Sequence, residues 1–216
     1  MTPIETLVAA SVARIELSHA AREQALTAAR SLIRQCANTI RAAHRGDFAT
    51  ATQLLAEAST TVGTMRQLLT PHADLLYAGY TQDAFKEYAE AALVCALLAQ
   101  TPPPSADTLG IPPAAYLNGL AEAASELRRA ILDGLRRGET ERGEALLAVM
   151  DEIYSLLITI DYPDAVTGGL RRTTDALRAV LERTRGDMTT AIRQDRLATA
   201  LERHYITLNE GNTTNE

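Results

Sequence analysis

The sequence predicts an all-α protein, folded as an antiparallel bundle of about seven helices. No stretch of strand length alternates polar and apolar residues with a period of two. The chain is 46% hydrophobic but only 4% aromatic, which suits a helical core built from alanine and leucine. Short turns marked by glycine and proline separate the helical segments, and such turns join antiparallel neighbours.

Three helices are expected in the first half of the chain. The first has no interior glycine or proline, and Gly46-Asp47 ends it and caps the second. The second stops before Pro71, because a residue that precedes proline resists the helical conformation. A short connection at residues 72–79 leads into the third. The expected helical ranges are residues 4–43, 48–69 and 80–100.

Four more helices are expected in the second half. A proline-rich loop at residues 101–110 precedes a restart at Ile111-Pro112-Pro113, since proline is tolerated in a first helical turn. Gly138, Asp161-Tyr162-Pro163 and a cap at Gly186-Asp187 separate the others. The expected ranges are residues 111–137, 139–160, 165–185 and 187–204. No boundary suggests two domains, so residues 1–208 should form one domain and residues 209–216 a disordered tail.

Composition limits the classes of function. A formal net charge of -6 argues against a surface coated in basic residues, although it leaves room for a local basic track. No apolar run reaches membrane-spanning length and the N-terminus has no signal-peptide layout, so no membrane partner and a cytoplasmic location are expected. Cys36 and Cys95 are isolated and lack metal-ligand spacing, which favours buried thiols in a reducing compartment.

The third expected helix carries an acidic stripe. Asp83, Glu87 and Glu90 fall within about 60° of one another on a helical wheel, in an otherwise apolar segment. Carboxylates at this spacing could hold Mg²⁺ or Mn²⁺, which prefer oxygen ligands. The spacing alone favours the plainer interpretation, an exposed acidic face beside Lys86.

The first expected helix carries a basic stripe. Lys86 is the only lysine, so nearly every cation is arginine, which binds phosphate bidentately. Arg30, Arg34, Arg41 and Arg45 stay within about 60° along roughly 22 Å of helix, with His44 beside the end of the row. The row could follow the phosphates of a nucleic-acid strand. It fits equally well an ordinary face that is solvated or paired with acids of a neighbouring helix.

Several separate segments, in the same order, resemble the translin superfamily, which comprises translin and translin-associated factor X; the similarity is greatest to its archaeal members. The resemblance extends from about Arg22 to Asp187 and includes the segment Asp161–Arg172. Its most specific segments are Gly79–Ala84, Glu87–Ala91, Leu109–Pro113, Tyr116–Leu120 and Ser125–Arg129. It implies a helical protomer that assembles into a hollow homo-oligomer, commonly an octamer, and binds RNA or single-stranded DNA inside.

In the factor X branch of that superfamily, carboxylates bind Mg²⁺ and cleave RNA phosphodiesters. The Glu-Tyr-x-Glu-Ala pattern of this branch falls on Glu87 and Glu90. The third carboxylate of the branch follows a tyrosine that aligns with Tyr154, where this chain has Ser155. A serine hydroxyl is a weak, neutral ligand and does not offset the charge of a cation.

Two interpretations of this departure remain open. In one, Asp151, a turn before Ser155 on the same face, joins Glu87 and Glu90 as the catalytic set. Asp83 and Glu126 could then supply further oxygens to Mg²⁺ or Mn²⁺, and the reaction would be metal-assisted hydrolysis of RNA. In the other, the site is degenerate and the protein binds nucleic acid without cutting it.

The resemblance also implies basic residues on the first helix for nucleic-acid contact. The expected nucleic-acid-binding residues are Arg30, Arg34, Arg41, His44 and Arg45, with Arg171 and Arg172 as further candidates that could equally bind helix-end carbonyls or an acid of another subunit.

Two other classes of function compete with nucleic-acid binding. A non-catalytic helical scaffold would use the acidic stripe only for subunit contacts. A carboxylate-bridged di-metal enzyme is disfavoured, because it needs paired Glu-x-x-His motifs and only Glu16 and His19 have that spacing.

Overall fold

The computed structural model describes residues 2–213, with side chains described as far as Thr207. Within these residues every regular element is a helix, so the all-α class is confirmed. The longer helices are α1 (Pro3–His44), α2 (Phe48–Leu69), α4 (Gly79–Ala99), α6 (Pro113–Leu135), α7 (Thr140–Leu157) and α9 (Leu170–Thr213). Single helical turns form α3 (Ala73–Leu76), α5 (Ala106–Leu109) and α8 (Asp164–Thr167).

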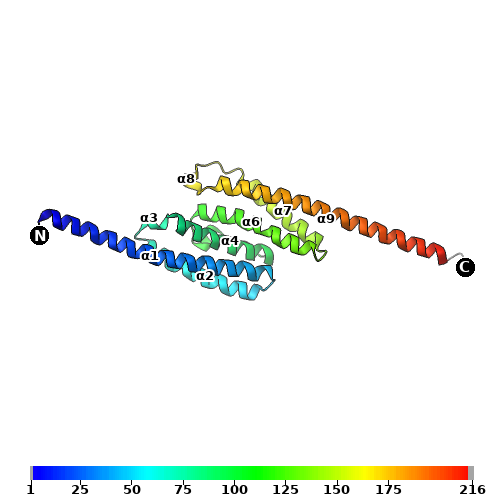
Figure 1. Cartoon of the computed structure of the whole chain (residues 1–216), viewed down its shortest axis with the longest axis horizontal. Helices are drawn as coiled ribbons and strands as arrows, with labels where there is room; N and C mark the ends of the chain where they lie inside the picture. Colours follow the sequence, from blue (N-terminus) through cyan, green and yellow to red (C-terminus); the bar gives the residue numbers. More distant parts are fainter. Residues whose placement is uncertain (1, 214–216) are drawn as a thin grey trace.

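The helices pack in the order of the chain. Helices α1 and α2 form an antiparallel pair, α4 packs on both, α6 packs on α4, and α7 and α9 pack on α6. Helices α4 and α6 therefore occupy the middle of the bundle (Figure 1). The first part of α1 and the last part of α9 extend beyond the bundle at opposite ends of the molecule.

The predicted punctuation after the first helix is confirmed. Gly46 adopts a left-handed backbone with φ of +75°, a conformation that glycine reaches without steric cost. The side chain of Asp47 then caps α2 by accepting a hydrogen bond from the backbone N–H of Thr50 at 3.1 Å.

The break predicted at Gly186-Asp187 is wrong, because α9 runs straight through it. Glycine in a helix costs only about 1 kcal/mol relative to alanine, and burial of Leu181 and Met188 on either side outweighs that cost. Asp187 also forms an ion pair at 2.7 Å with Arg128 of α6. Helix α9 continues to Thr213, inside the segment 209–216 predicted as a tail, and residues 214–216 lie outside the described residues.

Helix α4 is buried on most of its surface. Its apolar side chains join a core shared by α1, α2, α6, α7 and α9, whose largest buried members include Leu32, Met65, Phe85, Leu127 and Leu177. Cys36 is fully buried and Cys95 is half-buried, and both are free thiols. None of the helices described here is both long and apolar enough to cross a membrane.

Candidate metal centre and nucleic-acid interface

Helices α4 and α6 approach each other closely at Gly119. A Cβ atom at this position of α6 would lie 2.6 Å from Cβ of Ala89 and 2.6 Å from the backbone oxygen of Lys86. It would also lie 3.0 Å from the backbone nitrogen of Glu90. Only glycine lets the two backbones pack this tightly, and the contact falls beside the acidic residues of α4.

We expect Gly119→Ala to push α4 and α6 apart. Overpacking of this kind costs about 1–3 kcal/mol, which should lower the melting temperature by roughly 2–10 °C. Gly63→Ala is the matched control, because Gly63 is also helical but a Cβ there meets nothing within 4 Å. The control should be neutral or up to about 1 kcal/mol more stable. Equal melting temperatures for the two variants would contradict the close approach.

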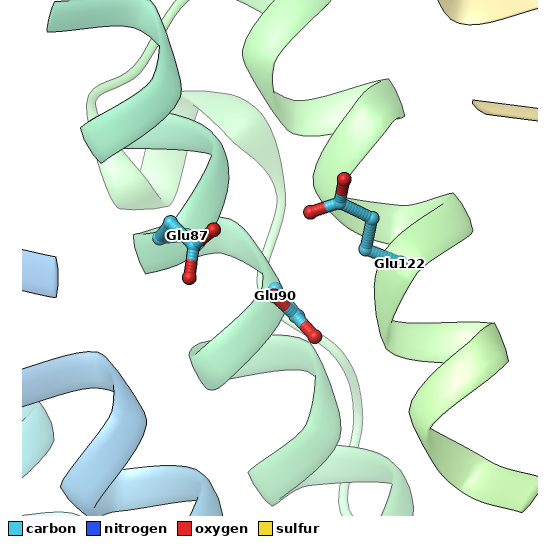
Figure 2. Close-up of side chains that lie close together, drawn as sticks. All are labelled: Glu87, Glu90 and Glu122. Carbon is cyan, nitrogen blue, oxygen red and sulfur yellow. The ribbon is translucent and has the colours of Figure 1, made fainter. Parts of the chain in front are cut away.

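Three carboxylates converge across the α4–α6 contact. Glu87 and Glu90 come from α4, and Glu122 comes from α6, one turn after Gly119 (Figure 2). One oxygen from each carboxylate lies within 4.8 Å of the other two. All three side chains are half-buried, so the cluster is partly shielded from water.

The cluster has an excess of negative charge. Burial, together with the charges of Glu87, Glu122 and Glu126, raises the pKa of Glu90 to about 8. Burial also raises the pKa of Glu87, and the neighbouring ammonium of Lys86 opposes this rise. Each raised pKa reports that an ionised carboxylate is disfavoured in this place, and a bound cation would relieve that cost.

Two basic side chains lie beside these acids: Lys86 contacts the three-carboxylate cluster, and His44 contacts the nearby Glu126. Nζ of Lys86 donates a hydrogen bond to Oε1 of Glu122 at 2.7 Å and lies 4.0 Å from Oε1 of Glu87. Nε2 of His44, near the end of α1, lies 2.8 Å from Oε1 of Glu126. The pair of His44 and Glu126 links α1 to the face of α6 that carries Glu122.

The three carboxylates fit a divalent cation. Mg²⁺ and Mn²⁺ take oxygen ligands at about 2.1 Å, so the ligands of one ion lie within about 4 Å of each other. Small side-chain rotations would bring the three oxygens of Glu87, Glu90 and Glu122 to that separation. The residues that could hold the ion are therefore two glutamates of α4, which lie three residues apart, and one glutamate of α6.

Comparison with known proteins places this architecture in a family. No family model matches the chain. An uncharacterized protein of Methanocaldococcus jannaschii is 31% identical over 192 residues, covering 88% of this chain and 84% of the relative. The solved structure of AfC3PO with duplex RNA is 31% identical, with a TM-score of 0.77 over 88% of this chain and 98% of that one. The crystal structure of AfC3PO is 30% identical, with a TM-score of 0.79 over 88% of this chain and 98% of that one.

The chain belongs to the translin family. A further translin-family structure, apo-NeC3PO, is only 17% identical but has the same fold, with a TM-score of 0.77 over 88% of this chain and 98% of that one. The fold of this family therefore persists where most side chains differ.

In this translin-family chain the structure brings together only part of the acidic set named from sequence. Glu87 and Glu90 meet, and their partner is Glu122, which sequence reasoning missed. Asp83 is exposed near the ammonium of Lys86, and Glu126 contacts His44 instead. The available signal for Glu122 was its position one turn after a helix-interior glycine and one turn before Glu126.

Asp151 lies outside the cluster. Helix α7 packs on α6 and α9, and Asp151 stands on its exposed face, where it pairs with Arg185 of α9 at 2.8 Å. Ser155 is exposed on the same helix. The serine at this position therefore takes no ligand away from the three-carboxylate cluster.

The basic row of α1 is exposed apart from its histidine. Arg30, Arg34, Arg41 and Arg45 are all exposed, and none forms an ion pair with a side chain that the structure describes. His44 lies apart from this row, because its side chain is only 3% exposed and turns towards Glu126.

The two later arginines lie beside different cavities. Arg172, in the first turn of α9, lines a cavity of about 420 Å³ together with Lys86 and Glu122. Arg171 lines a separate cavity of about 920 Å³ beside Asp161. Of the pair, Arg172 therefore lies on the side of the carboxylate cluster.

Proposed function

We propose that this protein is a translin-type RNA-binding oligomer that hydrolyses RNA phosphodiesters with Mg²⁺ or Mn²⁺ held by Glu87, Glu90 and Glu122. The convergence of these three carboxylates within 4.8 Å is the observation that carries the proposal. The structure of AfC3PO was solved in complex with duplex RNA, and AfC3PO is 31% identical to this chain, which covers 98% of it. This similarity supports RNA as the nucleic acid that the protein binds.

The roles of the residues follow from their chemistry. A divalent cation, when bound, polarises a phosphate oxygen and lowers the pKa of a coordinated water. Glu87, Glu90 and Glu122 hold and orient the cation from two helices fixed by the Gly119 contact. Arg172 lines the cavity next to Glu122 and can donate hydrogen bonds to a phosphate there.

RNA binding rests on the exposed row of arginines on α1. Arg30, Arg34, Arg41 and Arg45 present guanidinium groups along one face, spaced to meet successive phosphates of a strand. The link between His44 and Glu126 brings the end of this helix to the same part of the bundle as the carboxylates. A strand bound along α1 would therefore end near the metal ligands.

Assembly with further copies of the chain follows from the two ends of the molecule. The projecting parts of α1 and α9 expose large apolar side chains that a monomer would leave in water, and such patches are typical of protein interfaces. They include Ile4, Leu7, Val8, Ile15 and Leu17 on α1 and Leu197, Leu201, Tyr205 and Ile206 on α9. The octamer implied by the family resemblance would cover them.

The same apolar ends favour the second candidate function, a non-catalytic scaffold. A scaffold needs the exposed ends of α1 and α9 but no metal centre, and it would assemble in the presence of EDTA and cleave nothing. Size-exclusion chromatography with light scattering should show an oligomer in either case, so cleavage separates the two functions.

The proposed function is tested with labelled single-stranded RNA, duplex RNA and single-stranded DNA, each incubated with Mn²⁺ or with EDTA. We expect RNA to bind in both conditions and to be cleaved only with Mn²⁺. Because the cation must displace the proton of Glu90, cleavage should increase as the pH rises towards about 8. RNA binding without cleavage would favour a degenerate site, at which the protein binds nucleic acid without cutting it. Assembly without RNA binding, even at low salt, would favour the scaffold and contradict both RNA binding and cleavage.

A further inference from the structure

Lys86 is the only lysine in a chain whose other basic side chains, apart from histidine, are all arginine. It lies on α4 directly before Glu87, and its side chain is 23% exposed. Its ammonium nitrogen is 2.7 Å from Oε1 of Glu122 and 4.0 Å from Oε1 of Glu87. The ammonium group therefore donates a hydrogen bond to one of the three carboxylates of the proposed metal centre and lies within ion-pair distance of a second.

An ammonium group and a divalent cation compete for the same oxygens. An ion about 2.1 Å from Oε1 of Glu122 would lie within about 5 Å of an ammonium nitrogen bonded to that oxygen. Two positive charges at such a separation in a half-buried site repel each other strongly. The hydrogen bond from Lys86 to Glu122 and full coordination by Glu122 are therefore alternatives.

The choice of lysine suits such an exchange. Lysine carries a compact charge on a flexible stem, so its ammonium can turn away from Glu122 into the adjoining cavity of about 420 Å³, which Lys86 itself lines. An arginine in its place would hold a carboxylate through two parallel hydrogen bonds and would be harder to displace. Asp83 is close enough to Lys86 to interact with its charge and offers an acid on the exposed side.

We propose that Lys86 is a displaceable counter-cation that competes with the divalent metal for Glu122 and so sets the metal affinity of the centre. This inference rests on the proposed metal site. Before metal binds, Lys86 offsets the repulsion among the carboxylates and holds Glu122 towards α4. When metal binds, the ammonium leaves Glu122.

The test is the Mn²⁺ affinity of the full chain at one pH, measured without RNA by electron paramagnetic resonance of free Mn²⁺. We expect Lys86→Met and Lys86→Gln to bind Mn²⁺ about tenfold more tightly than the unaltered chain, since the competing charge is gone. Arg137→Met is the control, because it removes the same unit charge from an ion pair with Glu139 at the α6–α7 turn. The control should leave the affinity unchanged.

The outcomes separate the inference from the proposed function. If the unaltered chain binds Mn²⁺ and Glu122→Gln weakens that binding, the metal site stands. Equal or weaker Mn²⁺ binding by folded Lys86→Met and Lys86→Gln then overturns the role of Lys86, because Lys86 would instead position Glu122 for the metal. If the unaltered chain binds no Mn²⁺ at Glu122, both the proposed metal site and the competition fail.

Discussion

Glu122→Gln should lower the Mn²⁺ affinity of the chain by at least about 100-fold and abolish metal-dependent RNA cleavage. Glutamine keeps the size of the side chain but removes one of the three negative charges that would face the ion. Loss of an outer residue that only orients a ligand already costs about 10–100-fold in metal affinity, and Glu122 would be a ligand itself. RNA binding in EDTA should be unchanged, because Glu122 is not itself a proposed RNA contact and the arginine row of α1 is left intact.

Asp151→Asn is the matched control for this prediction. Both substitutions replace an acid by its amide, and Asp151 is the acid predicted from sequence to replace the carboxylate that is missing at Ser155. Because Asp151 pairs with Arg185 on the exposed side of α7, its substitution should leave Mn²⁺ affinity and cleavage intact. Loss of cleavage in Asp151→Asn with full cleavage in Glu122→Gln would contradict the assignment.

Reversing two charges of the basic row should weaken RNA binding strongly. The variant with both Arg34→Glu and Arg41→Glu loses two phosphate contacts and gains two repulsive charges, so its affinity should fall by about 10–100-fold at low salt. The slope of log K against log salt concentration should also become shallower by about 1.5. Filter binding of labelled RNA over a salt series measures both quantities.

A pair of exposed arginines on α9 provides the comparison. Arg178 and Arg183 lie five residues apart on α9, outside the basic row, and Arg178→Glu with Arg183→Glu makes the same change in net charge. If the row on α1 is the binding track, this second variant should lose little affinity. Equal losses in both variants would mean that the overall charge of the protein, and not the track, governs binding.

Most of the fold could be predicted from sequence because it depends on local signals. The turn at Gly46-Asp47 and the proline-rich loop after α4 are set by residues that act on their own backbone. The prediction failed at Gly186, where the local signal for a break is overruled by burial of Leu181 and Met188 against other helices. Tertiary packing of this kind leaves no trace in the glycine itself.

Only two of the three carboxylates of the proposed metal centre could be predicted from sequence. Glu87 and Glu90 share a face of one helix, so helical spacing reveals them. Glu122 joins them only because Gly119 lets α6 pack against α4, and that pairing of helices is a property of the folded chain. The same limit explains why Asp151 and His44 were assigned to the wrong surroundings from sequence. Helical spacing does not reveal that Asp151 pairs with Arg185 of α9 or that His44 turns towards Glu126 of α6.

The most direct measurement of the proposed metal centre is an anomalous difference map from a crystal grown with Mn²⁺. We expect one strong peak between α4 and α6, about 2.1–2.2 Å from oxygens of Glu87, Glu90 and Glu122, with the ammonium of Lys86 turned away from Glu122. A map with no peak there, and with Lys86 still bonded to Glu122 at saturating Mn²⁺, would contradict the metal centre.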